Sequence, residues 1–162
     1  MKKIICALLS LVLLCSCSSA GNVKVVNRNI SYKAHIFYFG KEIDLFCNIK
    51  ENCAEYTVIN GMADGFTAIV DGDGIKVGIE GLEKEIETED SAVFSVLYGV
   101  TSFFDGQNYK LNNDGGNFFL DGETSFGKFR YSLTPAGLPI SLEFENGNFS
   151  VKFYDITLKK TK

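Results

Sequence analysis

The 162-residue sequence is poor in the residues from which most active sites are built. It contains one histidine, no tryptophan and no G-x-S-x-G serine motif, and 20 acidic residues outnumber its 16 basic ones. Without a credible Cys/His pair or a cluster of metal ligands, neither nucleophilic catalysis nor a zinc site is expected. Without a basic surface, nucleic-acid binding is not expected either. The sequence therefore predicts a protein that is not an enzyme and carries no metal or cofactor.

Aromatic residues, by contrast, are abundant: the chain has 14 phenylalanines and seven tyrosines, and 46% of all residues are apolar. A chain of this length and composition forms one domain with its own core. The runs 37–39, 103–104 and 118–119 place rings on both faces of their elements. A sheet that is apolar on both faces is either covered twice or curved around an interior where an acyl chain can lie. A filled core and such a cavity both remain open.

The first 20 residues have the three-part layout of an export signal. Lys2 and Lys3 precede an apolar run over 4–14, and small residues follow it. The run is too short to be a stable membrane-spanning anchor. We therefore expect this segment to direct export and to lie outside the fold.

The end of the signal, Leu14-Cys15-Ser16-Cys17, resembles the lipobox of bacterial lipoproteins. In that family an apolar residue at position minus three and a small one at minus one precede the acceptor cysteine, which would be Cys17 here. The resemblance implies cleavage after residue 16, acylation of Cys17 by fatty acids such as palmitate, and attachment to the outer side of a bacterial membrane. An ordinary secretory signal cut near Ala20 is the alternative.

The predicted organisation is a signal peptide over 1–16, a lipidated cysteine with a short tether over 17–29, one domain over 30–158 and a basic tail over 159–162. Because the body is acidic, it should not adhere to an anionic membrane by charge, so the acyl chains would have to hold it there. The membrane is thus the first predicted partner, and the predicted location is lipid-anchored and extracytoplasmic.

Two cysteines remain after such processing, Cys47 and Cys53. Outside the cytoplasm such a pair often forms a disulfide, and a hairpin turning around 50–52 would place the two residues opposite each other. Apolar alternation argues against this, because it puts the two cysteines on different faces unless the turn carries a bulge. We predict a disulfide, with two unlinked small buried residues as the alternative.

Short β-type runs separated by Gly, Asn and Asp turns fill most of the chain from residue 30 onward. The strongest hairpin signal is Asn146-Gly147, since these residues tolerate the positive φ angles of a tight turn. The runs predict about nine antiparallel strands, over 30–39, 42–49, 54–59, 66–70, 75–79, 117–120, 126–133, 140–144 and 149–158.

One helix is expected within 88–106, where Gly106 would end it. Its apolar residues recur at three- and four-residue spacing, at Val93, Val96, Leu97, Val100, Phe103 and Phe104. An acidic run over 80–90 precedes it. We interpret this run as an exposed loop that favours the helix dipole, rather than as the paired carboxylates of a glycoside hydrolase. The predicted class is therefore mainly β with one substantial helix (α+β).

The C-terminal stretch 131–156 resembles the LolA/LolB type of lipoprotein-handling fold. The matching features are the Gly-x-Pro sequence at 137–139 that begins a strand, the acidic-Asn-Gly turn at 145–147, and a closing strand that ends in Asp155-Ile156. In that family a curved antiparallel sheet forms an unclosed barrel, with helices as a lid over an apolar cavity that receives acyl chains. The resemblance covers 30–158 as a pattern and implies a LolA-like domain.

Together these features predict a membrane-anchored lipoprotein that binds a lipid or acyl chain in an apolar groove of a curved sheet. The residues predicted to line the groove are Phe37, Phe39, Leu45, Phe94, Leu97, Val100, Phe104 and Phe118. The alternative is a non-catalytic interaction module with a filled core and no ligand, which docks a protein partner of the cell envelope.

Overall fold

A computed structural model describes residues 28–71, 74–86, 93, 94, 97, 110–114, 116–124 and 126–159, apart from the side chains of Met62 and Lys110. Turns divide these residues into strands and one short 3₁₀ helix, η1 (Gly61–Ala63). The strands are β1 (Ile30–Tyr38), β2 (Lys41–Ile49), β3 (Cys53–Val58), β4 (Thr67–Asp71), β5 (Ile75–Ile79), β6 (Leu82–Ile86), β7 (Lys110–Asp114), β8 (Asn117–Thr124), β9 (Gly127–Leu133), β10 (Pro139–Phe144) and β11 (Phe149–Leu158).

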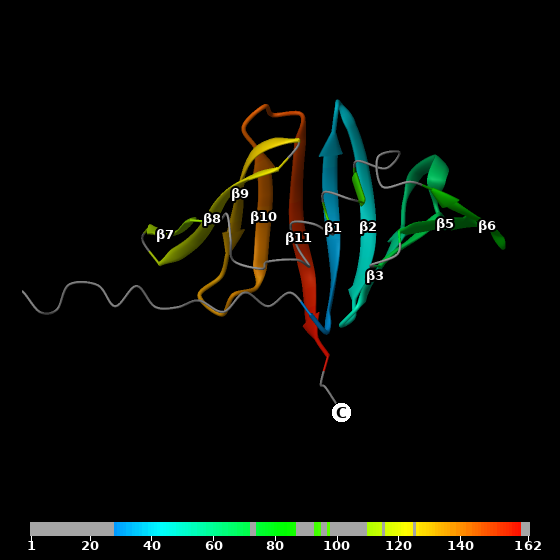
Figure 1. Cartoon of the computed structure of the whole chain (residues 1–162), viewed down its shortest axis with the longest axis horizontal. Helices are drawn as coiled ribbons and strands as arrows, with labels where there is room; N and C mark the ends of the chain where they lie inside the picture. The colour runs from blue at the N-terminus through cyan, green and yellow to red at the C-terminus, as the bar shows by residue number, and fades with distance from the viewer. Residues whose placement is uncertain are drawn as a thin grey trace, which may run out of the picture.

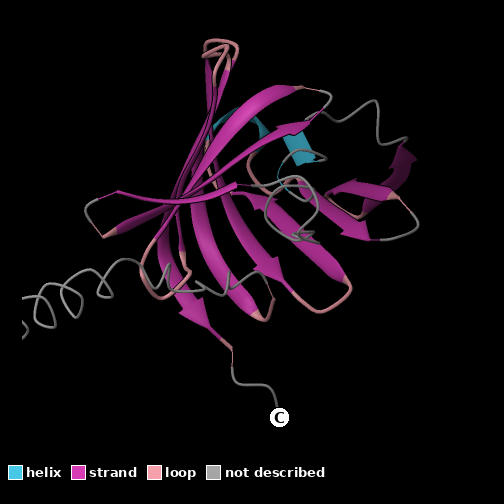
Figure 2. Ribbon diagram, turned by 60° about the vertical axis from the view of Figure 1, so that its left-hand side comes forward, coloured by secondary structure: helices cyan, strands magenta, loops and turns pink. Residues whose placement is uncertain are grey.

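All 11 strands form one antiparallel sheet in the order β6-β5-β4-β3-β2-β1-β11-β10-β9-β8-β7 (Figure 1). The first and last strands, β1 and β11, lie side by side at its centre, where Ile30 pairs with Leu158. The chain therefore builds one wing outward from β1 to β6 and the other inward from β7 to β11. Figure 2 shows that the sheet is curved and does not close on itself.

One face of the sheet carries the core, and we call it the inner face. In β2, Leu45 and Cys47 are buried, whereas Phe46 between them is exposed on the opposite, outer face. The same alternation in the other strands joins buried apolar side chains of β1–β5 and β8–β11 in one continuous cluster. This is the usual arrangement of an antiparallel sheet with one packed face and one solvated face.

Three described residues of the predicted helical segment, Val93, Phe94 and Leu97, are helical and pack on the inner face. They are the only α-helical positions among the described residues, and the rest of 88–106 lies outside them. The predicted α+β class with one substantial helix is therefore wrong, because the described part of the chain is nearly all β. The curved, unclosed antiparallel sheet is confirmed. No helix in the described ranges has the length and hydropathy to cross a membrane.

The sheet has two more strands than the sequence predicts. The edge strand β6 lies within the acidic run for which the sequence predicts an exposed loop, and most of its residues are exposed. Charged side chains on both faces of β6 remove the alternation of apolar and polar residues by which a strand is predicted from sequence. They suit an edge strand because they discourage pairing with other chains. Lys76 of β5 forms an ion pair with Glu85 of β6 at 3.6 Å. The opposite edge strand, β7, is short and mostly polar.

The register of β2 and β3 separates the two cysteines. Cys47 pairs with Tyr56, because the turn pairs Ile49 with Ala54. Cys47 is buried on the inner face, whereas Cys53 precedes the buried Ala54 and so lies on the outer face. Both cysteines are free. The predicted disulfide is wrong: the two cysteines are unlinked, as in the alternative, but only Cys47 is buried.

The two thiols are expected to differ in reactivity. A maleimide should label Cys53 in the folded protein and Cys47 only after unfolding, since burial raises the pKa of the Cys47 thiol and leaves little reactive thiolate. Mass spectrometry of protein starting at Asn22 measures the labels before and after denaturation without reductant. Unlabelled protein after denaturation would reveal a disulfide and contradict the register.

Candidate functional site

The inner face brings together half of the residues predicted to bind a ligand. Leu45 and Leu97 are fully buried in its cluster, and the half-buried Phe94 and Phe118 pack against it. The Phe94 ring lies 5.4 Å from the ring of Tyr56 and 6.3 Å from that of Phe66, measured between centroids. The helical residues thus lie over the β3–β4 side of the inner face.

The other predicted residues do not join this group. Phe37 follows the buried Ile36 and pairs with Glu42 and Ser150, so it lies on the outer face and is not placed to line an interior groove. Phe39 lies in the turn after β1. Val100 and Phe104 lie outside the described residues.

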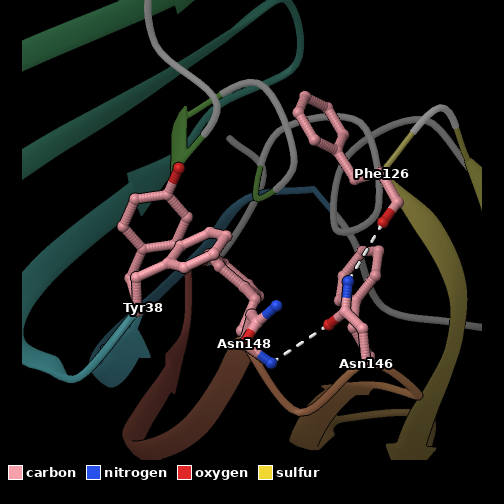
Figure 3. Close-up of a pocket in the computed structure, with 7 residues that line it drawn as sticks. Tyr38, Phe126, Asn146 and Asn148 are labelled. Atoms are coloured by element: carbon pink, nitrogen blue, oxygen red, sulfur yellow. Dashed lines mark hydrogen bonds between the residues drawn. The ribbon is translucent and has the colours of Figure 1, made fainter.

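A small apolar pocket opens at one end of the sheet, where the β1–β2, β8–β9 and β10–β11 hairpins turn (Figure 3). Its volume is about 80 Å³. Sites for drug-sized ligands usually measure roughly 300–1,000 Å³, so this pocket can hold the end of an acyl chain but not a whole lipid. The lining residues are Tyr38, Phe39, Phe126, Phe144, Asn146, Asn148 and Phe149.

Hydrogen bonds fasten these three turns to one another. The Phe39 N–H donates to the Asn148 carbonyl oxygen at 2.9 Å. The Asn146 side-chain amide donates to the Phe126 carbonyl at 3.5 Å, and its own oxygen accepts from the Asn148 N–H at 3.0 Å. The β1–β2 turn and the β8–β9 turn are therefore both joined to the β10–β11 turn. We call the five rings held here the aromatic rim, which consists of Tyr38, Phe39, Phe126, Phe144 and Phe149.

Phe39 has an unusual backbone for an aromatic residue. Its φ is 47° and that of Gly40 is 79°, so both central residues of this turn are left-handed. Such a turn favours Asn-Gly, and a bulky residue in its first position costs roughly 1–3 kcal/mol. The Phe39 side chain is nevertheless 64% exposed, so little of this cost is recovered by burial of the ring.

Three fully buried tyrosines, Tyr32, Tyr56 and Tyr131, add polar atoms to the inner face. The Tyr32 and Tyr131 rings meet the Phe153 ring at centroid distances of 5.1 and 5.9 Å. Burial raises the pKa of the Tyr131 phenol, which therefore stays neutral. The face is thus uncharged, although it is not purely hydrocarbon.

The outer face is polar at its centre. His35 Nδ1 lies 2.6 Å from Asp44 Oδ1, and the same aspartate is hydrogen-bonded by Asn60. His35, the one histidine of the chain, is half-exposed in its strand. No group of three or more histidine, cysteine or acidic side chains in the described part of the chain could hold a metal ion.

Sequence reasoning missed most of the aromatic rim. The available signal was an aromatic residue directly before a turn glycine, in Phe39-Gly40 and again in Phe126-Gly127. Tight turns usually carry Asn, Asp or Gly at such positions. The signal does not reveal that the two turns border one pocket, because their proximity depends on the β1–β11 pairing.

No protein-family model and no curated protein matches the sequence. The fold is similar to the crystal structure of a LolA superfamily protein from Nitrosomonas europaea, with a TM-score of 0.50 and 8% sequence identity. The match covers 86% of this chain and 90% of that chain. At this identity the similarity shows the fold alone, and it confirms the LolA-like fold that the 131–156 stretch predicts.

Proposed function

We propose that the protein is a membrane-anchored, extracytoplasmic lipoprotein whose curved sheet binds the acyl chain of a lipid. The observation that carries this proposal is the continuous apolar inner face, which spans both wings of the sheet. Among the described residues no charged side chain is buried. An acyl chain laid on such a face gains about 25 cal/mol for each Å² of apolar surface removed from water. The LolA-like fold supports this proposal.

Binding would exchange one apolar contact for another. Phe94 and Leu97 now cover part of the inner face, and the pocket at the aromatic rim is too small for a whole chain. An acyl chain that lies along Tyr56 would therefore displace the Phe94 ring from its contacts with Tyr56 and Phe66. No covalent step is involved, and selectivity would come from the absence of buried charge.

A contact quencher tests this mode of binding. The chain has no tryptophan, so a Phe94→Trp variant carries a single fluorescent indole. We expect dibromostearate to quench it saturably, because the brominated chain lies against the inner face. A Phe46→Trp variant on the outer face is the matched control and should keep its fluorescence. Equal quenching of both, or of neither, would contradict the proposal.

Anchoring rests on the resemblance of 14–17 to a lipobox. Cells fed an alkyne analogue of palmitate should incorporate it into the wild-type protein, which should sediment with membranes. A Cys17→Ser variant should take up no label, because it lacks the acceptor thiol. Wild-type protein that is unlabelled and found in the soluble fraction would instead indicate an ordinary secretory signal.

The burial of the inner face also supports a second candidate function. Most of its side chains are already fully covered, as in a filled core. A filled core fits a non-catalytic module that docks an envelope protein through its outer face or an edge strand. An unquenched Phe94→Trp variant, together with a stable crosslinked protein partner, would favour this function over acyl binding.

A further inference from the structure

The aromatic rim and the ends of the chain lie at opposite ends of the central strands. Ile30 pairs with Leu158 at one end of β1, and Tyr38 pairs with Phe149 at the other. β1 has nine residues, and a strand rises about 3.3 Å per residue, so its two ends are roughly 26 Å apart. The segment that precedes residue 28 therefore joins the domain far from the aromatic rim.

The aromatic rim exposes two phenylalanines on the two turns that flank the β10–β11 turn. Phe39 is 64% exposed and Phe126 is 43% exposed. Figure 3 shows the Phe126 ring and the Tyr38 hydroxyl on the same side of the turn that carries Asn146 and Asn148. Exposed rings beside amides and a phenol form an amphipathic edge, which is the composition found where proteins meet the headgroup region of a bilayer.

The backbone conformation of Phe39 also indicates that its exposed ring has a function. Asparagine would suit its left-handed φ, yet the chain keeps a large apolar ring there and leaves it in solvent. Strained residues of this kind are found where the side chain has a function that offsets the cost. The backbone of Phe39 is held in place because its N–H donates to the Asn148 carbonyl, and its ring lies 4.8 Å from the Tyr38 ring, measured between centroids.

We propose that the aromatic rim inserts into the interfacial region of a lipid bilayer, with Phe39 and Phe126 as the inserting side chains. Rings at hairpin tips can enter the roughly 5–10 Å of the headgroup and acyl boundary. A flat protein interface would instead need a broad complementary surface.

The length of the tether allows this contact. The stretch from Cys17 to Arg28 can extend to roughly 36–40 Å at 3.3–3.6 Å per residue, which exceeds the roughly 26 Å between the two ends of β1. A domain anchored at Cys17 can therefore turn its aromatic rim onto the membrane that holds it. The inference rests on the proposed function only for this anchor, because the exposed rings do not depend on acyl binding.

Depth-dependent quenching tests the proposal on the full chain. Phe39→Trp and Leu158→Trp variants place single tryptophans at opposite ends of the sheet, and both positions are exposed. Each is reconstituted in vesicles of phosphatidylcholine and phosphatidylglycerol with brominated acyl chains, and compared with unbrominated vesicles. Phe39→Trp is expected to lose most of its fluorescence and Leu158→Trp very little. Equal quenching, no quenching, or quenching of Leu158→Trp alone would overturn the proposal.

A second variant separates insertion from folding. Phe39→Asn should raise the thermal midpoint, because it relieves the left-handed strain, and should weaken quenching of a Phe126→Trp probe in the same chain. Unchanged quenching of that probe would overturn the role of Phe39. Quenching of Phe94→Trp by dibromostearate remains a separate readout, so failure of insertion and failure of acyl binding can be told apart.

Discussion

Replacing Leu45 with alanine is expected to lower the free energy of unfolding by about 2–5 kcal/mol. Leu45 is 1% exposed and lies in β2, where it pairs with Ala34 of β1 and Val58 of β3. Truncation would leave a cavity at the centre of the inner face, where neighbours fixed in a sheet cannot collapse fully. Urea unfolding of the two proteins under one set of conditions measures the difference.

The neighbouring residue supplies the control. Phe46 is 40% exposed on the outer face, so Phe46→Ala removes a larger side chain that buries less of its surface. Phe46→Ala should lower the free energy of unfolding by less than about 1 kcal/mol, in the range of ordinary surface substitutions. Comparable losses for Leu45→Ala and Phe46→Ala would mean that both faces are packed, and the division into inner and outer faces would fail.

Stability is also expected to fall steeply above pH 9, because two buried groups must stay protonated in the folded state. Burial raises the pKa of Cys47 above its ordinary value of 9.0 and that of Tyr131 above 10.0. The unfolded chain loses these protons at the ordinary values, so above them it binds fewer protons than the folded protein. The free energy of unfolding then drops by about 1.4 kcal/mol per pH unit for each group. The full stability is present below pH 9 and is lost as the pH rises towards the folded values.

A pair of cysteine variants isolates the contribution of Cys47 to this pH dependence. Cys47→Ala should flatten the decline of stability that begins near pH 9, whereas Cys53→Ala on the outer face should leave it unchanged. Urea unfolding between about pH 8 and about pH 11 gives both slopes. Each variant removes one thiol from the same chain, so contributions to the slope that the two variants share cancel in the comparison. Identical slopes would show that Cys47 is not a buried, neutral thiol.

Most of the sheet could be predicted from the sequence, because its signals are local. Alternation through Leu45 and Cys47 identifies the inner face of β2, and Asn146-Gly147 identifies the β10–β11 turn. β6 was missed because Glu83, Lys84 and Glu85 place charges on both of its faces. An edge strand tolerates this, whereas the periodicity argument requires one apolar face.

The candidate site was less predictable, since it depends on long-range pairing and on register. A shift in one turn decides whether Cys47 lies opposite Cys53 or Tyr56, and the sequence left that choice open. Phe39 and Phe126 come together only because β1 pairs with β11, which joins the two ends of the domain. Aromatic content alone predicts that Phe37 lines a groove, although alternation with the buried Ile36 places it on the outer face.

Native mass spectrometry of the protein from Asn22 to Lys162 tests most directly whether the inner face holds an acyl chain. The protein is purified without detergent, and organic extraction of the same sample identifies what was bound. We predict a second species heavier by the mass of one acyl lipid, which extraction removes. A single unliganded mass, unchanged after incubation with excess fatty acid, would contradict acyl binding.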